Sequence, residues 1–473
     1  MFSSRLAYLS IWYLYIGIIL FVIGWINSLV AVPVCLLLSW GLWRLRSEAH
    51  QSYTENNHVT WWGWACLILY SALCVFLCGF DGRVMQSWDF IVRNPLYNHL
   101  IEHTWPLQLQ NGSYVVYPMG FWLFPAYISQ FYSSYSTQIL QGWFFLGVLL
   151  MALNVWQTLG SQKTLMMLGA LFIFAPLTHV ADDVLNTIFY VDAYYSVHFR
   201  LLSPLTQMFN TYHFYVCGSL ALSLLIGRKA TAPMIVAITS ALAILHPMMA
   251  VILFPWILCT YIQRLKQAGT AWVSSFLHPV MAGCIATVTL VGLFYASSTG
   301  SECSLVFDAP HAKGYSTEYL LAFISGILLN VLPLLVCWRF CHRRILLYLT
   351  GCVPVLMLFW MGQENGISEW WYKFSVLYGF VLLFYLCSAW EKRGVRICLM
   401  VLMGLSLVPC MRELKRKELP KAIIASFSPN PDFIFTQYKR MDEINDSLRK
   451  QFISPHLKYP TLFRNASSSV VQD

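Results

Sequence analysis

Long apolar runs recur along almost the whole chain, and this feature constrains the fold more than any other. Most of them approach the ~20 residues that an α-helix needs to cross the hydrocarbon core of a bilayer. Of the 473 residues, 58% are hydrophobic and only 11% are charged, and the mean hydropathy is +0.59. A soluble domain would carry about a quarter charged residues. The sequence therefore predicts an all-α, multi-pass membrane protein without a separate soluble catalytic domain.

The length rule predicts about thirteen transmembrane helices. They are expected at 6–25, 28–43, 60–79, 137–156, 164–180, 205–226, 230–245, 247–263, 272–296, 318–338, 345–361, 372–390 and 395–411. The first run is too long for the core of a signal peptide, so we expect it to be retained as a span. Residues 114–130 are also apolar, but Pro118, Gly120 and Pro125 interrupt them. We expect a broken, re-entrant or interfacial segment there.

Charged residues are divided between alternate connections. The basic connections contain Arg44, Arg46, Lys163, Arg228, Lys229, Arg264, Lys266, Arg339, Arg343, Arg344, Lys392, Arg393 and Arg396. By the positive-inside rule these connections are cytoplasmic. The acidic connections then share the outer face; they lie at 80–114, 181–204, 297–317 and 362–371. Topology thus accounts for the net charge of +9, and no nucleic-acid partner is expected because no basic patch is interleaved with exposed aromatic residues.

The same pattern divides the chain at residue 411. Residues 1–411 form the predicted transmembrane domain, with 80–114 as its first long outer loop, and residues 412–473 form a polar tail. Because successive connections alternate between the two sides of the membrane, the count of spans places this tail outside. Its basic start conflicts with the positive-inside rule. No metal-ligand spacing appears, and no cofactor is expected, with a divalent cation on the paired outer acids as an alternative.

The outer loop concentrates ionisable groups beside a span, where such groups are costly to keep without a use. It contains Asp81, Asp89, Arg93, Asn94, His99, Glu102 and His103. An enzyme that takes a sugar from a lipid phosphate needs a carboxylate for the acceptor hydroxyl and a cation for the phosphate. The outer connections offer both, because Arg83, Arg93, Arg200 and Lys373 are outward cations.

Several segments, in the same order along the chain, carry a resemblance to a known family. Trp88-Asp89, Arg93-Asn94, Asn98-His99-Leu100 and Trp105-Pro106 are similar to a "DWxKHN…DL…WP" loop, Tyr114 to Ala126 to "YLVYYxxYYLPAAL", Tyr212-His213 to "PQH", and Glu369 to Ser375 to "DFxMRxS". These motifs belong to bacterial multi-pass glycosyltransferases of the GT-C class. Members of this class use polyprenyl-phosphate-linked sugars.

The resemblance implies a GT-C-like helical bundle in a bacterial inner membrane, with its active face in the periplasm. It implies that Asp89 is the catalytic base, with Asp81 as its rival. Substrate-binding roles are implied for Arg93, Asn94, His99, His213, Glu369 and Lys373. The donor would be a polyprenyl-phosphate sugar, and the acceptor an envelope glycan, lipid or protein, without a nucleotide or metal.

Three of these positions depart from the family pattern. Lys373 stands in place of an arginine and so lacks the bidentate fork that suits a phosphate. Arg93 replaces a histidine and His99 replaces an aspartate. These departures leave open a divergent acceptor, a rearranged site or a member without transferase activity.

Each candidate also has a structural interpretation. Asp89 could cap a helix that begins near residue 90, and His213 could be a packing residue within a span. Glu369 and Lys373 are four positions apart and could pair at a helix start. His246 and His278, each followed by proline, are interpreted as kinks at span ends.

Two other functional classes stay open for the whole protein. A secondary transporter or flippase-like protein of envelope-polysaccharide assembly would place ionisable residues in mid-span. An inactive scaffold subunit would keep the fold without depending on the carboxylates.

Overall fold

Helices dominate the described part of the chain. The computed structural model describes residues 2–52, 57–82, 84–87, 89–109, 111–188, 201–226, 230–267, 273, 277–297, 302–305, 316–337, 359–362, 369–417, 453–454, 457 and 459–464. Within these residues, eight helices are long and apolar enough to cross a membrane. The class of an all-α, multi-pass membrane protein is confirmed, whereas the expected count of about thirteen spans is not.

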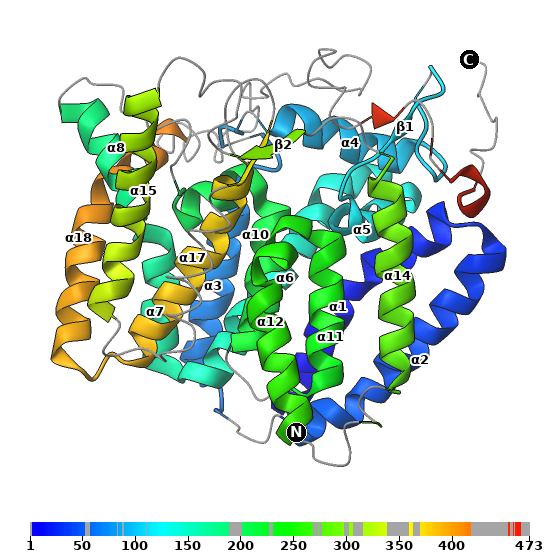
Figure 1. Cartoon of the computed structure of the whole chain (residues 1–473), viewed down its shortest axis with the longest axis horizontal. Helices are drawn as coiled ribbons and strands as arrows, with labels where there is room; N and C mark the ends of the chain where they lie inside the picture. The colour runs from blue at the N-terminus through cyan, green and yellow to red at the C-terminus, as the bar shows by residue number, and fades with distance from the viewer. Residues whose placement is uncertain are drawn as a thin grey trace.

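Most helices of the bundle, including some shorter than a full membrane span, run between its two ends (Figure 1). They are α1 (Phe2–Trp25), α2 (Ser28–Ser52), α3 (Trp61–Cys78), α6 (Ser136–Leu159), α10 (Pro204–Ile226), α11 (Ala232–Leu245), α12 (Pro247–Gln267), α14 (Pro279–Tyr295), α15 (Ser316–Cys337), α17 (Glu369–Ser388) and α18 (Arg393–Arg416). We call the end that carries α4 (Phe90–Glu102) the outer face. The opposite end carries the N-terminus, and we call it the basic face.

Local sequence signals fix several helix ends. Thr60 begins α3, because its hydroxyl accepts the N–H of Gly63 at 3.1 Å. Gly79 ends the same helix with φ 68°, a left-handed conformation that glycine adopts without a steric penalty. His278 caps α14 by accepting the N–H of Val280. The predicted structural role of His278 at a span end is confirmed.

The apolar segment at 114–130 is broken, as the sequence predicts. It consists of β1 (Tyr114–Val115) followed by α5 (Gly120–Phe131), a helix of 12 residues. This is well short of the ~20 residues needed for a crossing. The short helix η1 (Ser133–Tyr135) then leads into α6.

A candidate span is found where one is expected at 164–180, as Ser161–Leu185, but it is divided into two helices. The first helix, α7 (Ser161–Ile173), ends before Pro176, and α8 (Leu177–Ile188) begins directly after it. Proline has no backbone N–H and disfavours the helical conformation of the residue before it, which explains the break. Asp182 and Asp183 therefore lie inside a helix rather than in the loop expected from residue 181.

Two short antiparallel strand pairs complete the described structure. In the first, β1 pairs with β4 (Ile453–Ser454), which precedes the helix η5 (Pro460–Leu462). In the second, β2 (Glu302–Leu305) pairs with β3 (Phe359–Gly362). The predicted span at 345–361 is therefore wrong at its end, where the chain forms a strand with a pairing partner. Residues 345–358 of this predicted span lie outside the described residues.

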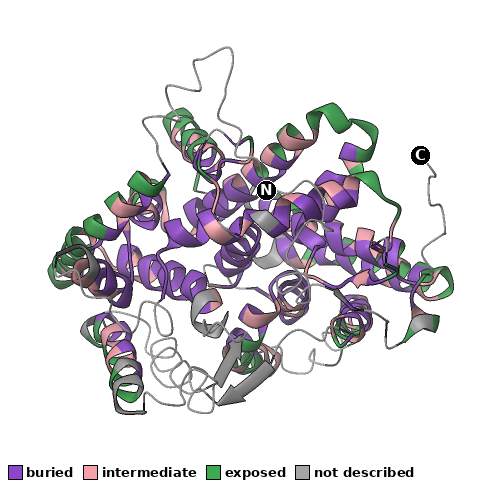
Figure 2. Ribbon diagram, turned by 90° about the horizontal axis from the view of Figure 1, so that it is seen from above, coloured by how far each residue is buried: buried purple, intermediate pink, exposed green. Residues whose placement is uncertain are grey.

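Buried and exposed side chains are distributed as expected for a helical bundle in a bilayer. In Figure 2, buried residues fill the middle of the bundle and exposed ones gather at its edge. Large apolar side chains are exposed on peripheral helices, for example Leu29 and Leu36 of α2 and Met400 of α18. An ion pair of 2.8 Å between Lys163 and Glu391 joins the start of α7 to the connection before α18. Exposed apolar side chains on the bundle surface are consistent with a lipid environment.

Candidate active site

The loop between α3 and α4 carries both candidate carboxylates and is fixed by side-chain hydrogen bonds. Gln86 donates from Nε2 to the carbonyl oxygen of Gly79 at 2.7 Å. Asn94 of α4 donates from Nδ2 to Oε1 of Gln86 at 3.0 Å. Asn94 therefore helps to set the position of this loop, in addition to any contact with a substrate.

The two carboxylates differ in their surroundings. Asp81 is exposed in the turn after α3. Asp89 directly precedes α4, as the capping interpretation predicts, but it makes no side-chain cap hydrogen bond. Its Oδ2 lies 3.0 Å from Nη2 of Arg93, and the two side chains are 35% and 5% exposed, respectively. Asp89 is thus a carboxylate at the surface whose cationic partner is buried beneath it.

Aromatic rings attach this loop to α10. Phe80 and Phe90, which are the sequence neighbours of the two carboxylates, pack against Tyr212 with ring centroids 4.8 and 5.3 Å away. Tyr212 is buried, and its hydroxyl accepts the Nε1–H of Trp122 at 2.7 Å. The guanidinium carbon of Arg93 lies 6.0 Å from the centroid of the same ring. Tyr212 therefore connects the loop, α5 and α10.

His213 follows directly and lies in an aromatic cage. The backbone of α10 is kinked at Thr211, which has φ −132° and ψ 50°. The His213 ring lies 4.3 Å from the Trp122 ring and 4.0 Å from the Phe214 ring, centroid to centroid. It is 1% exposed, and within the described part of the chain neither ring nitrogen has a hydrogen-bond partner. Buried polar groups are nearly always hydrogen-bonded, so this imidazole is suited to contact a ligand.

Lys373 and a second imidazole also lie beside Phe214. Lys373 Nζ lies 4.7 Å from the centroid of the Phe214 ring, and the His246 ring lies 4.5 Å from it. His246 forms the break between α11 and α12, and its Nδ1 accepts the N–H of Met249 at 3.3 Å. Its Nε2 is buried and has no hydrogen-bond partner among the described residues. The kink interpretation of His246 is confirmed, and the structure adds a position beside His213 that the sequence did not indicate.

The remaining predicted residues lie elsewhere or are not described. His99 stacks on His103 with ring centroids 4.0 Å apart. It lies ten positions beyond Asp89 on α4, or about 15 Å along the helix axis. The structure therefore does not bring His99 to the group around Tyr212. Glu369 begins α17, but its side chain lies outside the described residues, and so does its predicted pairing with Lys373.

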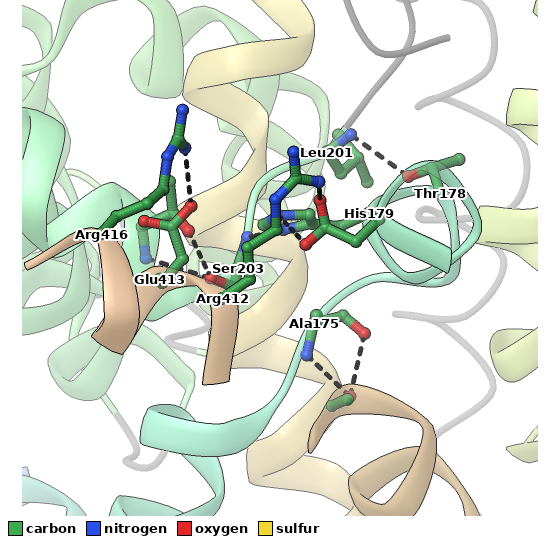
Figure 3. Close-up of polar contacts among 11 residues, drawn as sticks. Ala175, Thr178, His179, Leu201, Ser203, Arg412, Glu413 and Arg416 are labelled. Atoms are coloured by element: carbon green, nitrogen blue, oxygen red, sulfur yellow. Dashed lines mark hydrogen bonds and ion pairs between the residues drawn. The ribbon is translucent and has the colours of Figure 1, made fainter. Parts of the chain in front are cut away.

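A second polar cluster, which the sequence analysis did not single out, joins α8 to α18 (Figure 3). Arg412 pairs through Nη1 with Oδ1 of Asp183, and Nε2 of His179 lies 3.4 Å from Oδ2 of the same carboxylate. His179 accepts the backbone N–H of Ser203 through Nδ1 at 3.0 Å. Asp182 beside it is also fully buried. In the sequence, the adjacent acids Asp182 and Asp183 at the end of an apolar run were the one signal that could have indicated this cluster.

The first group brings together a carboxylate that can accept a proton, two cations that can hold an anion, and imidazole nitrogens that can form hydrogen bonds. Among the described residues, no group of three or more His, Cys, Asp or Glu side chains is arranged to hold a metal ion. In comparisons with known proteins, no family model, no curated protein and no solved structure matches this chain.

Proposed function

We propose that this protein is a GT-C-type glycosyltransferase of a bacterial inner membrane. It moves a sugar from a polyprenyl-phosphate carrier to an envelope glycan, lipid or protein acceptor on the periplasmic side. One observation carries the proposal: Asp89, Arg93, His213 and Lys373 come from three separate helices and gather around the Tyr212–Phe214 segment of α10. The resemblance of the sequence motifs to that class of enzymes supports the same assignment.

In the proposed reaction, an acceptor hydroxyl attacks the anomeric carbon of the lipid-linked sugar. The new bond forms between the acceptor oxygen and this carbon, while the bond from the carbon to the phosphate oxygen breaks. The hydroxyl proton passes to Asp89, or to Asp81 as the alternative base. The released polyprenyl phosphate carries the departing electron pair, and the charges of Lys373 and Arg93 stabilise it. In this proposal His213 hydrogen-bonds the sugar or the phosphate.

The acceptor can reach Asp89 from water because a third of its side chain is exposed. The lipid-linked donor must instead approach from the bilayer. The ion pair with Arg93 orients the carboxylate in the resting enzyme. When the donor phosphate engages Arg93, the carboxylate becomes available to the acceptor.

A secondary transporter is the second candidate, and the buried cluster of α8 and α18 favours it. His179, Asp183 and Arg412 form the kind of ionisable group that proton-coupled transporters keep inside the bundle. Two facts weigh against this candidate. Asp183 belongs to α8, a helix of 12 residues at the outer-face end of the bundle (Figure 1). Its ion pair with Arg412, which joins α8 to α18, is also a sufficient structural role.

The test is transfer of labelled sugar from polyprenyl-phosphate donors in membranes that contain the wild type or one variant. Asp89→Asn and Asp81→Asn remove each candidate base. Glu102→Gln is the matched control, because Glu102 is an exposed carboxylate at the end of α4, on the same outer face. We expect loss of about 100-fold or more for the base and little change for the control.

Three outcomes separate the candidates. Loss confined to Asp89→Asn or to Asp81→Asn, at equal protein abundance, identifies the base and supports the transferase. Wild-type membranes that transfer nothing from any donor refute it. Proton-coupled uptake or efflux that requires Asp183 but neither outer carboxylate would establish the transporter instead.

A further inference from the structure

A cavity of about 670 Å³ opens at the basic face, at the opposite end of the bundle from the proposed active site. It lies between the first turns of α1 and the last third of α2. Its lining residues are Ser4, Arg5, Tyr8, Trp43, Arg44, Arg46 and Ser47. Three of the seven side chains are guanidinium groups and none is acidic. The cavity is therefore strongly cationic.

The packing of α1 and α2 creates this arrangement. The two helices run antiparallel and pack along their length, so that α1 begins where α2 ends (Figure 1). Arg44 and Arg46 of α2 are exposed, and so is Arg5 of α1. Ser47 donates its hydroxyl to the backbone carbonyl oxygen of Arg44 at 2.8 Å, and both residues line the cavity. Three guanidinium groups from two helices thus border one space.

The aromatic residues of the cavity place it at the boundary between membrane and water. Trp43 is 60% exposed, and Trp40 one turn earlier on α2 is 52% exposed. Tyr8 contributes the third aromatic ring of this region. Tryptophan and tyrosine are enriched at the headgroup level of bilayers, where one side of the ring is apolar and the other is wet. A lipid whose acyl chains lie along the exposed apolar side of α2 would have its headgroup level with the arginines.

We propose that this cavity binds the headgroup of an anionic phospholipid of the cytoplasmic leaflet. Guanidinium groups form paired hydrogen bonds with phosphate oxygens, and they do so better than lysine. Basic pockets between transmembrane helices on the cytoplasmic side are suited to anionic headgroups. A diester phosphate within a bilayer matches both the charge and the neighbouring aromatic belt. The proposal does not depend on the transferase assignment.

The test measures lipid binding to the purified full chain. Native mass spectrometry monitors the protein during titration with phosphatidylglycerol or with phosphatidylcholine of the same acyl chains. We expect retention of phosphatidylglycerol over phosphatidylcholine. Arg44→Gln and Arg46→Gln should each weaken phosphatidylglycerol binding about five-fold. Arg396→Gln is the matched control, because Arg396 is an exposed arginine of the same face outside the cavity. It should leave binding unchanged.

Two further measurements keep the result interpretable. Arg44→Lys should retain part of the affinity, because the charge remains while the fork is lost. Competition with inorganic phosphate distinguishes a lipid site from a free-anion site. Displacement of the lipid by inorganic phosphate at similar concentration would overturn the lipid assignment. Equal binding of the two lipids, or equal effects of the Arg44 and Arg396 variants, would overturn the site.

Discussion

Removing the guanidinium of Arg412 should destabilise the fold far more than breaking another ion pair between separate elements. Arg412 of α18 pairs with Asp183 of α8, whose side chain is 3% exposed. The comparison pair is Lys163 with Glu391, whose side chains are 28% and 70% exposed. Both pairs connect segments that are far apart in sequence. Arg412→Gln and Glu391→Gln therefore differ mainly in the burial of the charge that is left behind.

The magnitude follows from that burial. A buried charge that loses its partner typically costs about 3–5 kcal/mol. The Arg412 side chain is itself 38% exposed, and His179 stays 3.4 Å from the Asp183 carboxylate after the substitution. We therefore expect the lower end, about 3 kcal/mol. The exposed pair should contribute about 0–1 kcal/mol. The double variant Asp183→Asn with Arg412→Gln should cost less than Arg412→Gln alone, since the buried Asp183 charge is removed together with its Arg412 partner.

The assay is the thermal unfolding midpoint of the purified protein in one detergent, followed by tryptophan fluorescence at a fixed scan rate. A fixed rate is needed because large proteins often unfold irreversibly, so that the midpoint depends on the scan. Equal shifts for Arg412→Gln and Glu391→Gln would refute the argument from burial. A double variant less stable than Arg412→Gln alone would refute the assignment of the cost to an unpaired Asp183 carboxylate.

Three further predictions concern other positions. Burial lowers the pKa of Lys417 to about 8 from 10.5, so the unfolded chain binds more protons between these values. The unfolding midpoint of the wild type should therefore rise with pH across this window, and Lys417→Met should flatten that rise. A Cβ added at Gly17 would overlap the backbone carbonyl of Gly120. Gly17→Ala should cost about 1–3 kcal/mol in an unfolding assay. Gly169→Ala, whose Cβ meets nothing within 4 Å, should be neutral. His213→Phe keeps a ring in the aromatic cage but removes both nitrogens, so sugar transfer should fall about ten-fold or more at equal abundance.

Apolar length and proline position carried most of what could be predicted about the fold. They indicated the long helices and the broken segment at 114–130, and the N-cap preference of aspartate indicated the start of α4 directly after Asp89. These features depend on residues close together in sequence. The division at Pro176 was missed because the apolar run continues past it, and hydropathy does not register the loss of one backbone N–H.

The candidate site could be predicted only in part, because its members come from distant segments. His213 of α10 and Lys373 of α17 both lie beside the Phe214 ring, and hydrophobic periodicity does not specify which helices pack together. The pair between Asp183 and Arg412 spans 229 positions and has the same limitation. By contrast, Asp89 and Arg93 are one helical turn apart, so their ion pair follows from local geometry alone.

The position of Asp89 depends on the opposite end of the chain. Lys417, directly after α18, donates from Nζ to the carbonyl oxygen of Met85 at 2.8 Å, and the same ammonium lies 4.3 Å from the centroid of the Phe209 ring. At the far end of the outer loop, β4 of the tail pairs with β1. Residues of the tail thus contact the outer loop near both of its ends. Because these contacts form only between segments hundreds of residues apart, the geometry around the proposed base is a property of the assembled bundle and not of the loop sequence that carries it.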